Sequence, residues 1–206
     1  MKKIILSILF IFSSTLNAQD MHDWALGINA SFNVPGGERG AIWQNGTGFG
    51  ITIEKFIYQM DQGNLDLAFS TGFTSWPAVA NDQGTGVNNN NNNNVGPDQR
   101  FFTEIIPTRL ALKYYVGQKN FNPFANIGLG YAYSFYKADQ KIAGTRNNYQ
   151  RETNEESFLF YDIGVGVRSS FARNFKVDIS INYQMFPEDI IGFNNLNFCL
   201  VALYTL

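Results

Sequence analysis

Two residue types with reactive side chains occur once each in the sequence, as His22 and Cys199. A Ser–His–Asp arrangement would have to use His22, which lies in a polar stretch before the first predicted strand. One histidine and one cysteine also provide no ligand cluster for a metal ion. We therefore expect no enzymatic activity, no metal site and no cofactor. Cys199 is interpreted as a small packing residue on an inward face.

A different kind of chemistry is indicated by charged residues that lie at alternating positions within otherwise apolar segments. Four acids are balanced by four bases, and an unpaired charge is costly in a poorly hydrated interior. We therefore predict an intermixed polar network of ion pairs rather than a catalytic centre. Its members are Glu54, Asp66, Arg109, Lys113, Asp162, Arg168, Lys176 and Asp178.

The segments that carry these charges alternate polar and apolar residues with a period of two, which is typical of β-strands with two different faces. In 123–136, for example, Ile127 and Leu129 alternate with Gly128 and Gly130. Each segment is long enough for the roughly 9–11 residues of a tilted membrane strand. The eight predicted strands are 24–34, 47–58, 64–76, 101–116, 123–136, 157–171, 175–186 and 195–206.

The two faces differ in a way that favours one solvent. A soluble eight-stranded barrel turns its apolar face inward around a ligand, whereas a membrane barrel turns that face toward lipid. Here the polar face carries small and charged residues, and the other face is densely aliphatic and aromatic. Lys55 is the exception, placed on the lipid face near a strand end where it can extend to the interface. We predict an all-β fold, an eight-stranded antiparallel up-and-down transmembrane β-barrel. Ile127, Leu129, Val165, Ile179 and Leu200 should face outward near mid-membrane.

The connections between the predicted strands alternate in length. With the N-terminus in the periplasm, the external connections are long and polar, except for a short last one: 35–46, 77–100, 137–156 and 187–194. The periplasmic turns 59–63, 117–122 and 172–174 are short, as in outer-membrane barrels. The run Asn88 to Asn94 is expected to be a mobile, solvated loop.

Some residues within the strands predict local features. Pro107 cannot donate to a ladder, so it predicts a bulge or the point where its strand leaves the membrane. The glycine pairs Gly128/Gly130 and Gly164/Gly166 are expected to make room for interior side chains. Aromatic residues near the strand ends predict interfacial belts, with Trp24 and Tyr204 on the periplasmic side and Trp76 and Tyr133 on the outer side.

The first residues resemble an export signal. Lys2 and Lys3 precede the apolar run from Ile4 to Phe12, which is too short to span a bilayer as a helix, and Ala18 is a small residue suited to cleavage. The alternative is an N-terminal anchor that stays attached. The predicted organisation is a signal peptide over 1–18 and an outer-membrane β-barrel domain over 19–206.

Bulk composition excludes other classes. The 206 residues include 16% aromatic and 16% charged residues, with 45% hydrophobic residues, which is too apolar for a disordered chain. A net charge of −2 provides no basic field for nucleic acid. The partners we expect are outer-membrane lipid, the barrel-assembly machinery during biogenesis and an unidentified ligand at the external loops, with the chain itself a monomer.

Several stretches carry a family resemblance: 106–117 (IPTRLALKYYVG), 123–135 (PFANIGLGYAYSF), 162–168 (DIGVGVR) and the alternation that ends at Leu206. With them the chain resembles the small outer-membrane β-barrel domains of Gram-negative bacteria, of the OmpA membrane-domain and OmpX type. The resemblance implies this architecture and a last strand that resembles the signal read by the assembly machinery. That strand usually ends in Phe, whereas this one ends in Leu206.

Eight strands leave an interior that side chains can just fill. The sequence therefore predicts a structural or surface-interaction barrel of the cell outer membrane, with a side-chain-filled polar lumen. The alternatives are a narrow porin-like channel for small solutes and a soluble periplasmic ligand-binding barrel.

Overall fold

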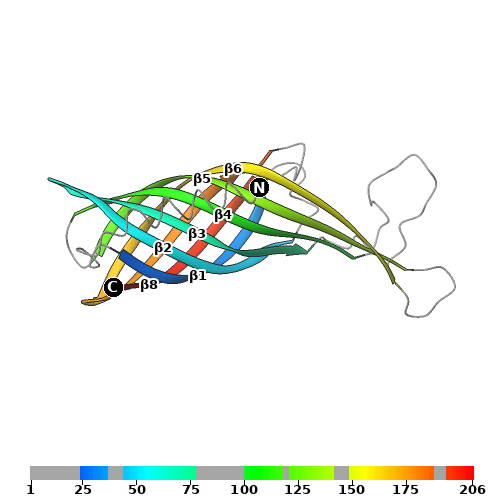
Figure 1. The fold of residues 1–206 in the computed structure, drawn as a ribbon, viewed down its shortest axis with the longest axis horizontal. Helices are drawn as coiled ribbons and strands as arrows, with labels where there is room; N and C mark the ends of the chain where they lie inside the picture. Colours follow the sequence, from blue (N-terminus) through cyan, green and yellow to red (C-terminus); the bar gives the residue numbers. More distant parts are fainter. Residues whose placement is uncertain (1–23, 37–43, 78–99, 118–120, 142–148, 188–193) are drawn as a thin grey trace, which may run out of the picture.

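The chain forms a closed barrel of eight strands in a computed structural model that describes residues 24–36, 44–77, 100–117, 121–141, 149–187 and 194–206 (Figure 1). Each strand pairs with its neighbours in sequence, and β1 closes the barrel against β8. The strands are β1 (Trp24–Gly36), β2 (Gly46–Met60), β3 (Gly63–Pro77), β4 (Arg100–Val116), β5 (Phe121–Lys141), β6 (Tyr149–Ala172), β7 (Phe175–Met185) and β8 (Asn194–Thr205).

All eight pairings are antiparallel, including the closing pair, in which Ala25 lies opposite Thr205. The predicted eight-stranded up-and-down barrel is therefore confirmed. No helix in the described part of the chain is long and apolar enough to cross a bilayer.

The two ends of the barrel differ, and we name them by their connections. At the short-turn end, β2–β3, β4–β5 and β6–β7 are separated by few residues, and the left-handed φ of +89° at Gly117 suits a residue without Cβ. At the long-loop end, β5 and β6 remain paired from the barrel out to Lys141 and Tyr149, whereas β6 pairs with β7 only from Tyr161 onward. This hairpin projects beyond the rest of the barrel (Figure 1).

The prediction that 137–156 is a loop is wrong, because most of this range is strand and forms the projecting hairpin. Its sequence is polar on both faces, so a hydrophobic alternation cannot reveal it. The run Asn88 to Asn94 lies outside the described residues.

The prediction of a bulge at Pro107 is wrong. Pro107 lies opposite Ala132 in an unbroken β4–β5 register, and the β3–β4 register is the same on both sides of it. Proline removes one donor, but its φ is compatible with an extended strand. The irregularities lie elsewhere, between Phe56 and Tyr58 in β2 and between Ser170 and Ala172 in β6.

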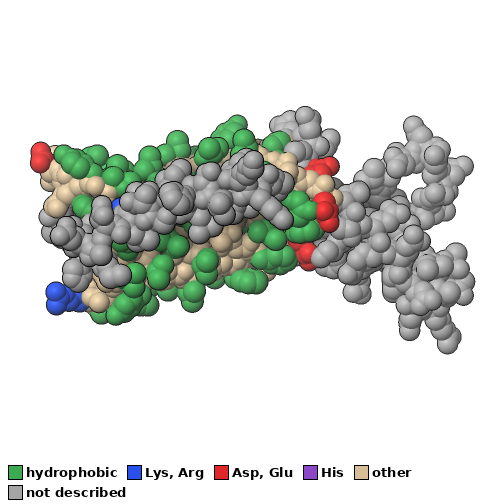
Figure 2. All heavy atoms as spheres, viewed as in Figure 1, with side chains coloured by type: hydrophobic (Ala, Val, Ile, Leu, Met, Phe, Trp, Pro, Cys, Tyr) green, Lys and Arg blue, Asp and Glu red, His purple; other side chains and the backbone are tan. Residues whose placement is uncertain are grey.

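Apolar side chains cover the outside of the barrel wall (Figure 2). The five predicted lipid-facing aliphatics are all exposed: Ile127 63%, Leu129 59%, Val165 63%, Ile179 63% and Leu200 50%. A contiguous apolar surface of this kind marks contact with membrane rather than water. The alternative of a soluble barrel with an apolar interior is therefore wrong.

Candidate functional site in the barrel lumen

The lumen at the short-turn end is occupied by a cluster of charged side chains centred on Arg168 of β6. Its guanidinium donates from Nε to Asp178 Oδ1 at 2.6 Å and from Nη2 to Asp178 Oδ2 at 2.8 Å, a two-pronged contact with β7. Nη1 reaches Asp66 Oδ2 of β3 at 3.1 Å, and Nη2 also donates to Glu54 of β2. One side chain thus connects four strands.

Lys113 of β4 completes this ionic cluster, which we define as Glu54, Asp66, Lys113, Arg168 and Asp178. Its ammonium donates to Glu54 and, at 2.9 Å, to Asp178 Oδ2. All five residues are buried. Because each charge is paired and hydrogen-bonded, the cost of removing these charges from water is offset, which an isolated buried charge could not achieve.

Aromatic rings line the cluster. The Arg168 Cζ lies 4.2 Å from the centre of the Tyr115 ring, and the Lys113 Nζ lies 5.4 Å from that of Phe124. The Tyr115 hydroxyl donates to Asp178 Oδ2 at 3.3 Å. Cation–π contacts of this kind stabilise buried cations and restrict their movement.

Lys176 does not join the ion pairs. It is half-buried and forms no ion pair within the described residues, but lines a hollow of about 120 Å³ at the short-turn end together with Asp66 and Arg168. On the outer face nearby, the Lys55 Nζ lies 5.0 Å from the centre of the Trp24 ring.

Arg109 and Asp162 form a separate ion pair nearer the middle of the lumen. Arg109 donates from Nε and Nη2 to the two Asp162 oxygens, both at 2.5 Å, and from Nη2 to Asn126 Oδ1 at 2.6 Å. Gly128 makes this possible, because a Cβ there would lie 2.7 Å from both Arg109 Nε and Asp162 Oδ2. The three other glycines of the predicted pairs likewise face large interior side chains: Gly130 faces Phe160, Gly164 faces Asn182 and Gly166 faces Phe124.

Toward the long-loop end the polar groups are neutral amides, an arrangement that the sequence reasoning missed. Asn126 donates to Asn182 at 3.0 Å, Asn182 to Asn197 at 3.4 Å, and Asn197 to Asn33 at 2.7 Å. Asn195 donates to Asn33 at 2.7 Å and to Gln184 at 2.6 Å. This amide network, defined as Asn33, Asn126, Asn182, Gln184, Asn195 and Asn197, joins β1, β5, β7 and β8. Strand phase could have located it, since its members share the inward face with the predicted charges.

An aromatic cluster packs beside the amide network in the same half. Its members are Trp76, Ile105, Ala132, Phe158, Phe160 and Phe186. Phe186 contacts three of the other rings, with centroids 5.5–6.5 Å apart. The prediction that Trp76 belongs to an interfacial belt is therefore wrong: its side chain points into the lumen and is 2% exposed. Tyr204 does face outward, with 55% exposed.

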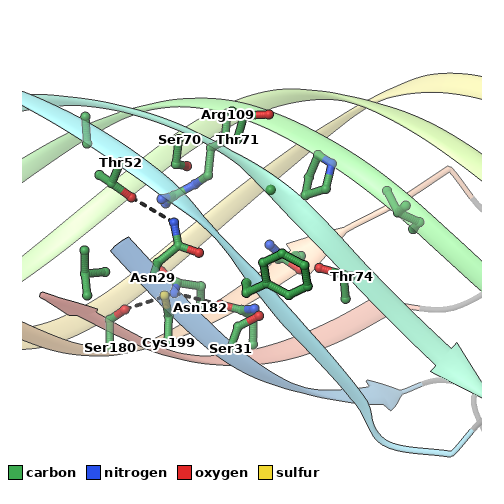
Figure 3. A pocket seen from close by; sticks show the side chains of 18 of the residues that line it. Asn29, Ser31, Thr52, Ser70, Thr71, Thr74, Arg109, Ser180, Asn182 and Cys199 are labelled. Carbon is green, nitrogen blue, oxygen red and sulfur yellow. Dashed lines mark hydrogen bonds between the residues drawn. The ribbon is translucent and has the colours of Figure 1, made fainter. Parts of the chain in front are cut away.

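Between the amide network and the aromatic cluster lies a cavity of about 100 Å³ (Figure 3). Asn29, Thr52, Arg109 and Asn182 point into it, and Asn29 donates to Thr52 at 2.9 Å. Cys199 also lines the cavity from β8, as a free thiol. The cavity thus offers amide, hydroxyl and guanidinium groups on one side and rings on the other.

His22 lies outside the described residues. Within the described ranges, no three His, Cys, Asp or Glu residues gather in a way that could hold a metal ion.

Comparison with known proteins gives a family and a fold. The family described as "Outer membrane protein beta-barrel domain" matches residues 4–202. No curated protein sequence matches the chain. Among solved structures, the chain is similar to a major outer membrane protein from Thermus thermophilus, at 13% identity and a TM-score of 0.54, covering 88% of this chain and 98% of that one.

Two further solved structures share the fold at low identity. The attachment invasion locus protein Ail of Yersinia pestis has 14% identity and a TM-score of 0.45, with 88% of this chain and 95% of that chain covered. Neisserial surface protein A has 13% identity and a TM-score of 0.47, with 89% and 97% covered.

Proposed function

Because the chain belongs to the outer membrane protein beta-barrel domain family and so to the cell outer membrane, we propose that it is a non-conducting barrel that acts through the surface of its long-loop end. In this family the short turns face the periplasm and the longer loops face the exterior. The projecting β5–β6 hairpin would then lie outside the cell, where an unidentified ligand could bind.

The ionic cluster is the observation that carries this proposal. Arg168 and Lys113 bind carboxylates from β2, β3 and β7 across the lumen, and all five cluster residues are buried. An ion passing through would have to displace charges that are paired in a poorly hydrated interior, which costs several kcal/mol. The lumen is therefore best suited to holding the barrel together.

Conductance in planar bilayers tests the proposal. We expect no current steps from the reconstituted full chain, and regular steps from a trimeric porin in the same bilayer. A variant that lacks the side chains of the cluster (Glu54→Ala, Lys113→Ala and Arg168→Ala together), shown to be folded by its heat-dependent gel mobility, should conduct if the cluster closes the lumen. Discrete steps from the unaltered chain would overturn the proposal.

A narrow channel for small solutes is the second candidate, and the two hollows favour it. The cavity of about 100 Å³ and the short-turn hollow of about 120 Å³ lie on opposite sides of the ionic cluster. If the cluster rearranged, these hollows would form most of a path, and the same recordings would detect it.

The proposal includes the biogenesis and state of the protein. We expect cleavage after Ala18, delivery to the barrel-assembly machinery, a monomer in lipid and no enzymatic activity. N-terminal sequencing of the protein from outer membranes should begin at Gln19. A chain that still begins at Met1 would instead indicate a retained anchor.

A further inference from the structure

At the height of the cavity, backbone pairing between β3 and β4 is interrupted over two positions. We call this interruption the β3–β4 seam. Backbone pairing runs from Thr71 opposite Thr108 to Thr74 opposite Ile105, and the two positions between them are not paired. Pro107, which occupies one of them, has no N–H to donate. In the neighbouring pairings β2–β3 and β4–β5, the ladder at this height is continuous.

The inner side of this seam carries almost no side chain. Gly72 lies opposite Gly50 of β2, and both occupy inward-facing positions. On the inner side, the wall at this height therefore presents only backbone and the Pro107 ring, and Phe73 and Ile106 cover its outer face. The lining of the cavity includes Thr71 and Phe73, whose side chains alternate to the outer face. The cavity thus extends to the inner side of the wall at this point.

The groups around the seam suit an amphiphile. Inside, Asn29, Asn182 and Arg109 can bind a polar head through amide and guanidinium groups. At the seam itself, the Thr71 and Thr108 hydroxyls are 3.2 Å apart, while Phe73 offers an apolar edge. We propose that the β3–β4 seam admits a single-chain amphiphile from the bilayer, with its polar head in the cavity and its alkyl chain passing outward between the two strands.

Cys199 provides a sensor for this route, because it lines the cavity and is the chain's single cysteine. The folded full chain in phosphatidylcholine vesicles is treated at alkaline pH, because the thiolate is the reactive form of cysteine. Two probes with the same maleimide head are compared by mass: N-dodecylmaleimide, which resides in the bilayer, and water-soluble N-ethylmaleimide. We expect N-dodecylmaleimide to modify Cys199.

The variant Pro107→Ala restores a backbone N–H at the seam. It should slow modification by N-dodecylmaleimide by about tenfold, the effect of roughly one restored backbone hydrogen bond, and leave modification by N-ethylmaleimide unchanged. Pro123→Ala is the matched control, a strand proline on the outer face of β5 at the short-turn end, and should change neither rate. Heat-dependent gel mobility establishes that each variant is folded.

Three results would overturn the proposal. N-dodecylmaleimide could fail to modify Cys199 in the folded chain while modifying the unfolded chain fully. Pro107→Ala could leave its rate unchanged, which would place the route elsewhere. Pro107→Ala could lower the rates of modification by both maleimides, which would indicate a tighter lumen rather than a closed seam. None of these results depends on conductance, so the proposal stands or falls separately from the non-conducting role.

Discussion

Inward-facing side chains fill both halves of the lumen, but the chemistry of these side chains differs between the halves. At the short-turn end, five charged residues form an ionic cluster around Arg168. At the long-loop end, neutral amides are joined in a chain through Asn33 and Asn182, with an aromatic cluster beside them. A cavity remains in the neutral half beside these amides (Figure 3).

The difference follows from the free-energy cost of a buried polar group that lacks a hydrogen-bond partner, which differs between the two halves. A buried charge without a partner is strongly destabilising, so the ionic cluster must be complete and closely packed. A neutral amide that lacks one bond costs much less, as the buried Asn195 Oδ1, which has no partner among the described residues, illustrates. The charged half is therefore suited to fixing the barrel wall, and the neutral half to accommodating a guest.

The largest expected effect comes from removing the centre of the ionic cluster. Arg168→Met should lower the free energy of unfolding by about 3–5 kcal/mol, because the buried Asp66 loses its cationic partner and Glu54 and Asp178 each keep only Lys113. Gln184→Met, the same replacement in the amide network, should cost about 1 kcal/mol. Urea unfolding in vesicles, followed by tryptophan fluorescence, measures both. Equal costs would show that the two halves do not differ as described.

A second change acts at the boundary between the halves. Gly128→Ala would place a Cβ 2.7 Å from both Arg109 Nε and Asp162 Oδ2, so the ion pair must move or separate. We expect a loss of about 1–3 kcal/mol, as for overpacking of a core. Gly36→Ala is the control, since a Cβ there would meet its nearest neighbour at 3.7 Å, and should stay within about 0.5 kcal/mol of the unaltered chain. The prediction fails if both alanine variants unfold at the same urea concentration.

A third change tests the amide network directly. Asn33 Oδ1 accepts hydrogen bonds from Asn195 and Asn197. Asn33→Ala should cost about 1–2 kcal/mol in the same unfolding measurement, because both donors lose an acceptor. A loss as large as that of Arg168→Met would mean that the neutral half is as tightly specified as the charged half.

The smallest effect is expected where a whole neutral pair is replaced. Asn29 and Thr52 bond to each other beside the cavity. Replacing both residues, as Asn29→Leu with Thr52→Val, should change the free energy of unfolding by less than about 1 kcal/mol. The reason is that neither a donor nor an acceptor of this hydrogen bond is left without a partner. The single change Thr52→Val should cost more than the pair. If the double variant is the less stable of the two, the polar pair is itself required.

The strand phase explains what could be predicted from the sequence. Period-two alternation located the eight strands and the outward aliphatics such as Leu129, because lipid and lumen require different side chains. It was uninformative for the β5–β6 hairpin beyond the rim, where both faces are polar. For Trp76 the alternation indicates the inward face that it shares with Thr74, and the wrong prediction of an interfacial residue comes from its place near a strand end.

The chemistry of the lumen was less accessible to the same reasoning. Charges stand out on a polar face, so Arg168 and Asp178 could be singled out, whereas asparagines are common in strands and loops of this sequence. Which amides meet depends on the register of the closing β1–β8 pair, which places Asn33 beside Asn195 and Asn197. Phe158 and Phe160 follow the inward phase of Asp162, but an apolar residue at such a position gives no sign that it joins a cluster.

The closing pair of strands has a consequence for the order of events during folding. β1 and β8 are the first and last strands of the barrel, and the backbone N–H of Leu206 donates to the Trp24 carbonyl at 2.9 Å. The contacts of greatest sequence separation therefore form only after β8 has been synthesised, and such contacts are slow to form. Until then both terminal strands expose an unpaired edge, a template for pairing with another chain. The nascent protein consequently needs protection until its last strand is available, and a truncation of β8 would be more harmful than one of equal length in the external hairpin.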